Sequence, residues 1–324
     1  MTHGAAIVRA HRLECAMSRS LTAAFVTLAL VFAATAPAQK VALGGAHDGQ
    51  IVQLLDCSRL GEGVSIEGLA RIVQALGEPA LPAANVCALG PDHIAVLGTP
   101  QQCAGAERVF AAAVEHAGTE VYIDCKTVRI DAALFARHFE PWFAKALPRP
   151  GAAEPAGERH VVVAEKDVVD ARLRLRGAPG FDTVQAPKII VLQLHEARLR
   201  IGQDRRYTAE HAMVVGADGA TTTRPVERTV FEGDDIAVVA TRGLAQEMLV
   251  HLKAARNALP FILPQVEVAL AGGKTGTIDV PHGTACSVDL CAVVPDGRVL
   301  VVAAPLRDGT FVCWLVQVHA IQGH

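Results

Sequence analysis

The sequence predicts an α+β protein, with a small N-terminal α/β module followed by a mostly antiparallel β domain. Strand and helix patterns alternate before residue 147, whereas almost every patterned segment beyond Gly180 is a strand. Between the two parts, residues 148–158 are rich in Pro, Gly and Ala and carry no apolar period, which is typical of an exposed linker. We therefore expect an α+β part at 39–147 and a β-rich domain at 159–324.

The N-terminus predicts export. Three arginines precede the apolar run at 21–34, and Ala36-Pro37-Ala38 follows it as a small-x-small cleavage site. A run of that length is too short to cross a bilayer as an ordinary transmembrane helix. Translation from Met1 or from Met17 would each supply the basic start of such a segment. Residues 1–38 are therefore expected to be a secretory signal peptide.

Charge and cysteine content narrow the class of partner and the compartment. The chain has 30 basic and 33 acidic residues and a formal net charge of −3, which argues against a nucleic-acid partner. No apolar run outside the signal reaches the length of a transmembrane helix, so any membrane contact would have to come from β-structure or from a partner. Seven of the eight cysteines follow the signal, an odd number that leaves at least one thiol unpaired or bridging two chains. Whether any of them form disulfides is left open.

The N-terminal part is expected to alternate strands and helices. Apolar residues recurring at helical spacing within residues 65–76 predict the first helix of this part. Thr99 is expected to cap the second helix, with Pro100 in the first turn and Gln102 completing a capping box. The expected elements are a strand at 51–55, a helix at 65–76, a strand at 93–97, a helix at 99–116, a strand at 120–130 and a helix from Asp131 to Phe143.

The β-rich domain is expected to begin with a strand at 161–164 and a short helix at 168–175. Beyond these, apolar runs divided by turn signals predict a series of strands. They are expected at 188–194, 197–201, 212–215, 228–231, 236–241, 248–252, 266–270, 276–280, 285–294, 298–303 and 310–318.

Residues 186–202 form the most informative pattern in the chain. Pro187 opens an apolar strand, a tight turn lies around His195 and Glu196, and an alternating strand ends at Gly202. By itself this pattern predicts a β-hairpin. None of its residues is chemically reactive in this arrangement, so it indicates architecture rather than catalysis.

The hairpin and the segment after it resemble the core of the bacterial secretins, the ring-forming outer-membrane channels of secretion and pilus systems. In that core a Pro, an apolar strand, a turn and an alternating strand end in Gly-Gln, which is Gly202-Gln203 here. A long polar loop then leads to a Gly before an apolar strand, which is Gly233 here.

Two further segments extend the resemblance. A strand ending at Pro281, followed by the turn Asp296-Gly297, is similar to a later part of the secretin core, with Ala303-Ala304 where the family usually has a Gly pair. Residues 94–124 are similar to the ring-building modules that precede the core. No counterpart of the gate-forming and C-terminal segments is found. The residues that carry the motif, and to which the resemblance gives a structural role, are Pro187, Gly202, Gln203, Gly233, Pro281, Asp296 and Gly297.

The resemblance implies a cell-envelope protein of the periplasm or outer membrane that assembles with itself into a cyclic homo-oligomer. Subunits with open sheet edges can bury those edges by pairing with their neighbours around a ring. Other secretion-system or pilus components are then partners, and neither catalysis nor a cofactor is implied. Two alternatives stay open: a pore-less periplasmic structural or adaptor protein of the same fold, and a secreted hydrolase, which would require a clustered acid–base or metal site.

Catalytic motifs are incomplete in this sequence. The segment Gly273-Lys274-Thr275 lacks the earlier glycine that a phosphate-binding loop needs, because Val268 occupies that position. His195-Glu196 lacks the second histidine of a zinc-binding helix. We therefore expect no catalytic, cofactor-binding or metal-binding residue.

Overall fold

The computed structural model describes residues 40–42, 50–79, 81–82, 85–145, 159–215, 217, 221–243, 245–270 and 274–321. The chain divides into two compact units between Ala117 and Gly118. The expected signal peptide at 1–38 and the expected linker at 148–158 lie outside the described residues.

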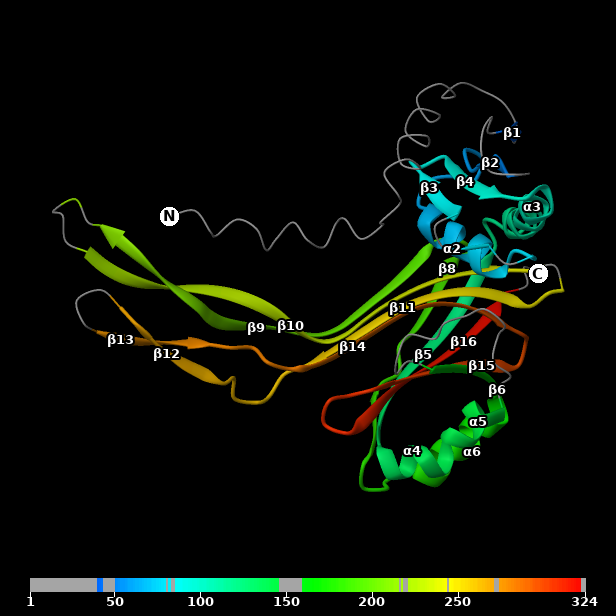
Figure 1. The fold of residues 1–324 in the computed structure, drawn as a ribbon. Helices are drawn as coiled ribbons and strands as arrows, with labels where there is room; N and C mark the ends of the chain where they lie inside the picture. Colours follow the sequence, from blue (N-terminus) through cyan, green and yellow to red (C-terminus); the bar gives the residue numbers. More distant parts are fainter. Residues whose placement is uncertain are drawn as a thin grey trace. The chain divides into compact units, whose positions relative to one another are not determined.

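The first unit is a four-stranded antiparallel sheet with two helices packed against it and against each other (Figure 1). The strand order is β1-β2-β4-β3. Strand β3 was not expected from the sequence, because its four residues show no clear alternation. The elements are β1 (Lys40–Ala42), β2 (Ile51–Asp56), α2 (Ile66–Leu76), β3 (Val86–Leu89), β4 (His93–Gly98) and α3 (Pro100–Glu115).

The helix starts of this unit follow the sequence. The Ser65 hydroxyl accepts a hydrogen bond from the Gly68 amide at 3.2 Å at the start of α2. At α3, the Thr99 hydroxyl accepts from the Gln102 amide at 3.3 Å and the Gln102 side chain accepts from the Thr99 amide at 3.0 Å. The predicted capping box is therefore confirmed, with Pro100 in the first turn.

The second unit begins with β5 (Glu120–Asp131), so the chain divides earlier than the sequence indicated. Strand β5 pairs with β16 (Thr310–Ala320) from Thr310↔Asp131 to Ala320↔Val121, inside a six-stranded sheet of order β6-β15-β16-β5-β7. The partner lies far along the chain, which no local pattern reveals. The other members are β6 (Arg159–Ala164), β7 (Phe181–Gln185), β8 (Lys188–Leu192), which also pairs with β5, and β15 (Arg298–Pro305).

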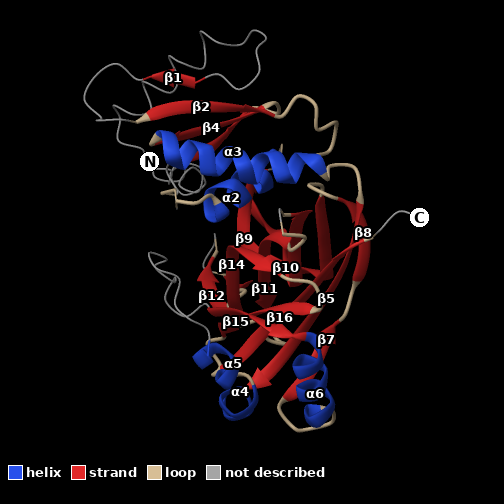
Figure 2. Cartoon of the chain, turned by 90° about the vertical axis from the view of Figure 1, so that its right-hand side faces the viewer, coloured by secondary structure: helices blue, strands red, loops and turns tan. Residues whose placement is uncertain are grey.

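Three helices cover one face of this sheet: α4 (Ala132–His138), α5 (Glu140–Lys145) and α6 (Glu165–Leu175) (Figure 2). The single helix expected from Asp131 to Phe143 is interrupted at Phe139, and Asp131 makes no side-chain capping bond. Phe135 is the buried residue of α4 and stacks on Phe311 with ring centroids 4.0 Å apart. Aromatic packing against the sheet therefore places these helices.

A four-stranded antiparallel sheet packs on the other face, in the order β14-β11-β10-β9. The two sheets share a core in which Trp314, Ile236 and Leu252 are fully buried. The α+β class is confirmed, with antiparallel strands predominating. The strands are β9 (Glu196–Val215), β10 (Thr221–Arg242), β11 (Met248–Ala258) and β14 (Thr284–Val294).

Strands β9 and β10 continue well beyond the sandwich as a two-stranded ribbon, beside the hairpin of β12 (Gln265–Ala269) and β13 (Thr275–Asp279) (Figure 1). The pairing runs from Val239↔Glu196 to Thr221↔Val215, with a bulge between Val226 and Glu227. The prediction of a long polar loop directly after Gln203 is therefore wrong, because β9 continues to Val215. The ribbon is largely exposed on both faces, so it lacks the apolar alternation that would have marked it as strand.

Candidate assembly surface

The predicted hairpin at 186–202 is a corner between two sheets. Strand β8 pairs with β5 in the six-stranded sheet, whereas β9 pairs with β10 in the other. Leu194 lies between them, fully buried, with φ +66° and its amide donating to the Ala240 carbonyl at 2.9 Å. The turn lies at Gln193 and Leu194, two residues before the expected turn around His195 and Glu196, and the expected mutual pairing of the two strands is wrong. Local sequence shows where a strand ends and cannot show which strand lies beside it.

Gln193 holds this corner. Its amide donates to the Thr119 carbonyl at 2.8 Å, and its side-chain amide donates to the Thr119 hydroxyl. Its side-chain oxygen accepts from the Thr241 hydroxyl at 3.1 Å and from the Arg242 amide at 2.8 Å. The side chain therefore connects the ends of β5 and β10, and nothing in the sequence pattern singled it out.

Pro187 lies at the break between β7 and β8, the two short strands that share the edge beside β5. Its carbonyl accepts from the Cys125 amide at 3.0 Å. Proline has no amide hydrogen to donate to a ladder, which suits it to the start of an edge strand. The resemblance gives Pro187 a structural role, and this position is compatible with one.

Gly202 and Gly233 face each other where β9 and β10 leave the sandwich. A Cβ on Gly202 would lie 2.0 Å from the Glu232 carbonyl oxygen, and one on Gly233 would lie 2.3 Å from the Ile201 carbonyl oxygen. Gly233 also has φ +147°, which L side chains rarely adopt. The two backbones approach too closely here for any other residue.

Gln203 continues this junction into a polar cluster. Its side-chain amide donates to the Glu232 carboxylate at 3.3 Å. Arg205 lies 3.4 Å from the same carboxylate and donates to the carbonyls of Pro260 at 2.7 Å and Phe261 at 2.9 Å. We call Arg205, Glu232 and these carbonyls the ribbon clamp, because they attach the segment leading to β12 to the β9–β10 ribbon.

Further contacts tie the β12–β13 hairpin to β9. The Asp279 carboxylate accepts from the Thr208 amide at 2.7 Å and from the Gln265 side chain at 3.0 Å. The Thr208 bond and then the Gln265 bond lower the pKa of Asp279. His211 makes a hydrogen bond of 3.0 Å with the Thr277 carbonyl. The ribbon and the hairpin are therefore joined along their length.

The remaining motif residues lie elsewhere in the second unit. Pro281 lies between β13 and β14. Asp296 and Gly297 form the turn between β14 and β15, where Gly297 has φ +69° and its carbonyl accepts from the Glu165 amide at 3.1 Å. The structure thus brings together Gly202, Gln203 and Gly233 and leaves the other four at separate turns and strand starts.

Asp234, next to Gly233, forms a buried ion pair with Arg256 at 2.8 Å. Asp234 is fully buried, and one of its carboxylate oxygens has no hydrogen-bond partner among the described residues. Burial raises the pKa of Asp234, and Arg256 opposes that rise. The pair therefore puts a charge at the base of the ribbon at a substantial desolvation cost.

The four-stranded sheet ends in β9 on one side and β14 on the other, and no described strand pairs with the outer side of either. The ribbon and the segment before β12 also carry exposed apolar side chains, with Met213 and Val215 each 68% exposed and Phe261 95% exposed. Open strand edges together with exposed apolar side chains are typical of surfaces that associate with other chains.

The described residues do not bring metal-binding side chains together at one site. In the described part of the chain, no set of three or more His, Cys, Asp or Glu side chains could hold a metal ion. None of the seven described cysteines forms a disulfide. None of the described helices has the length and hydropathy that crossing a membrane would require.

Neither a family model nor a curated protein matches the chain. Among solved structures, it is similar to InvG, the secretin of the Salmonella SPI-1 type III secretion injectisome, at 12% identity and a TM-score of 0.30, over 87% of this chain and 89% of that one. It is also similar to PilQ, the type IV competence pilus secretin of V. cholerae, at 9% identity and a TM-score of 0.28, over 94% of this chain and 82% of that one.

Proposed function

We propose that this chain is a secretin-like cell-envelope protein that is exported and assembles into a closed ring serving protein secretion or transport across the outer membrane. The seven motif residues support the family assignment. The observation that carries the assembly is the four-stranded sheet with two open edges, β9 and β14.

The order of the strands favours head-to-tail association. Successive strands in β14-β11-β10-β9 run antiparallel, so β9 and β14 run in opposite directions. A neighbouring subunit in the same orientation would place its β14 against β9 and continue the antiparallel order. Repeating that contact closes into a ring when the rotation between subunits divides a full turn.

Disulfide trapping tests this edge contact. Cys291 lies on β14, and Glu196, Arg198 and Arg200 lie at alternate positions of β9, so they share one face of that strand. We expect at least one of Glu196→Cys, Arg198→Cys and Arg200→Cys to give a ladder of cross-linked multimers on mild oxidation of the assembled protein. The same variant with Cys291→Ser should give none.

Lys253→Cys is the matched control, because Lys253 lies on the central strand β11, which is paired on both sides. A folded protein that gives no multimer with any β9 variant would contradict the β9–β14 contact. A wild-type protein that stays monomeric at every concentration, with and without detergent, would make the pore-less adaptor the better proposal.

A further inference from the structure

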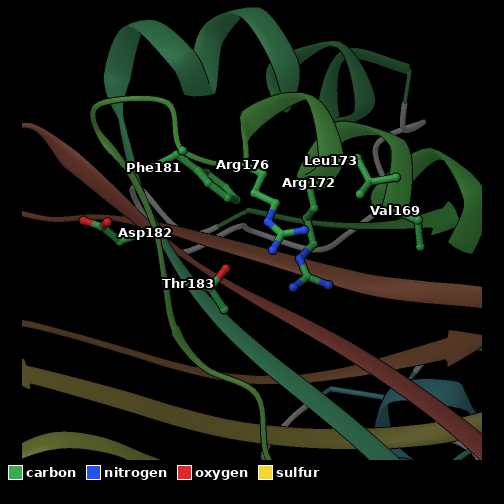
Figure 3. Close-up of a pocket in the computed structure, with 8 residues that line it drawn as sticks. Val169, Arg172, Leu173, Arg176, Phe181, Asp182 and Thr183 are labelled. Carbon is green, nitrogen blue, oxygen red and sulfur yellow. The ribbon is translucent and has the colours of Figure 1, made fainter.

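A groove of about 420 Å³ lies between α6 and β7 in the second unit (Figure 3). Val169, Arg172 and Leu173 line it from the helix, and Arg176 lines it from the position just after the helix. Residues 181–183 line it from the strand. The ring proposed above uses β9 and β14, so this groove is a separate surface.

The helix side of the groove is one continuous stripe. Positions 169, 172 and 173 follow the i, i+3, i+4 spacing that places side chains on one face of a helix, and Arg176 is the cap residue that follows the last helical position, Leu175. The opposite face holds α6 to the sheet through buried side chains such as Val168 and Leu175. Val169 and Leu173 are 42% and 61% exposed, so an apolar surface is presented between two cations.

The two arginines have no anionic partner in the described structure. No described carboxylate lies within ion-pair distance of Arg172 or Arg176, and the Arg172 Nε is buried without a hydrogen-bond acceptor. Figure 3 shows both side chains extending from the helix towards the space beside Thr183. Asp182 also lines the groove, so the formal charges of its lining side chains sum to +1. A buried guanidinium nitrogen without an acceptor is unfavourable, and a carboxylate would relieve it.

The strand side offers backbone hydrogen bonds. Strand β7 is the last strand of the sheet order, and no described strand pairs with its outer edge. An exposed strand edge is a template on which an extended peptide can add as a further strand. Its alternate side chains would then lie along one face, about 6.7 Å apart. That spacing is close to the about 6 Å that separates positions four apart on a helix, such as Val169 and Leu173.

We infer that the α6–β7 groove binds an extended peptide with acidic and apolar side chains, which adds as a strand to the edge of β7. Its acidic groups pair with Arg172 and Arg176, and its apolar groups cover Val169 and Leu173. A small inorganic anion would leave both the apolar surface and the strand edge uncovered. The β6 edge of a second copy, which no described strand covers, would bring Arg159 towards two arginines, and like charges disfavour that approach.

Selection from a random nonapeptide display library against the full mature chain tests the inference. We expect enrichment of peptides in which Asp or Glu alternates with Val, Ile or Leu. The selected peptide should bind the double variant Arg172→Glu, Arg176→Glu at least about tenfold more weakly, a loss of about 1.4 kcal/mol. Leu173→Asp should also weaken binding. Arg174→Glu is the matched control, since Arg174 lies on the same helix outside the groove and should bind as the wild type does.

Backbone methylation of the selected peptide tests strand addition separately. Methylating one set of alternate backbone nitrogens should abolish binding, because those amides donate to β7, while methylating the other set should be tolerated. Binding that survives both would overturn strand addition.

Selection without acidic enrichment, or equal binding by the double variant, would overturn the peptide site. Wild-type binding to phosphatidylglycerol vesicles that the double variant loses, with no peptide selected, would assign the groove to lipid instead. None of these results depends on ring assembly.

Discussion

At the scale of single residues, two facing glycines determine how β9 and β10 leave the sandwich. Gly202 and Gly233 permit a backbone approach that a single Cβ would prevent. Gly297 differs from these two glycines: its φ is +69°, but a Cβ there would meet nothing within 4 Å. Gly202 is required by close contact, Gly233 by close contact and by conformation, and Gly297 by conformation alone.

Gly233→Ala should therefore destabilise the second unit more than Gly297→Ala does. The positive φ costs roughly 1–2 kcal/mol at each position, and the clash with the Ile201 carbonyl adds roughly 1–3 kcal/mol at Gly233. Urea unfolding of both variants measures the difference. Equal losses would show that the approach of β9 and β10 relaxes without strain.

The Asp234–Arg256 pair shows the cost of burying charge beside that junction. Arg256→Met should destabilise the protein by about 3–5 kcal/mol at neutral pH, since it leaves a buried carboxylate uncompensated. The matched control is Arg228→Met, which removes an exposed pair with Glu210 and should cost less than about 1 kcal/mol.

The pH dependence gives a second test of the same pair. A carboxyl whose pKa is raised in the folded state binds more protons when folded than when unfolded, so its contribution to stability falls as pH rises above the ordinary value of 3.8. Removing Arg256 leaves only the burial that raises this pKa, so the loss caused by Arg256→Met should shrink on acidification. Unfolding free energies at several pH values measure this, and a loss that is constant with pH would contradict it.

At the scale of elements, the ribbon clamp joins two hairpins that the sequence presents as unrelated. Arg205 on β9 holds the carbonyls of Pro260 and Phe261 while pairing with Glu232 on β10. Both bonds to the carbonyls are exposed to solvent, so each is expected to contribute about 0.5–1.5 kcal/mol. The segment at Pro260 that leads into the β12–β13 hairpin is therefore held by a side chain 55 positions earlier in the chain.

Arg205→Met should loosen that hairpin without unfolding the sandwich. Amide hydrogen exchange should accelerate in β12 and β13 while β10 and β11 keep their protection. Arg206→Met is the control, because Arg206 is the exposed neighbour on the same strand and should leave exchange unchanged. Unchanged exchange in Arg205→Met would mean that the bonds of Asp279 and His211 are sufficient.

At the scale of the whole molecule, β5 decides where one unit ends and the next begins. It lies inside the six-stranded sheet, between β16 on one side and β7 and β8 on the other. Val121, Ile123 and Cys125 from this strand are fully buried in the core that the two sheets share. Removing β5 would expose that core along its length.

A fragment of residues 118–324 should therefore fold, whereas a fragment of residues 159–324, the domain that the sequence indicated, should not. Near-ultraviolet circular dichroism reports the packing of Trp314, which is buried beside β5 in the register Trp314↔Thr127. A cooperative thermal transition in the shorter fragment would contradict this division of the chain.

The sequence by itself determined the class of the fold and most element positions, because these depend largely on neighbours within a few residues. The capping box at Thr99 and the glycine at the Asp296-Gly297 turn are such local features. Tertiary structure alone decided the partner of each strand. It separated β8 from β9 at Leu194, assigned β5 to the second unit, extended β9 and β10 through polar sequence, and set Arg205 and Arg172 in their surroundings. Those outcomes depend on contacts between residues far apart in the chain, which periodicity within a segment does not encode.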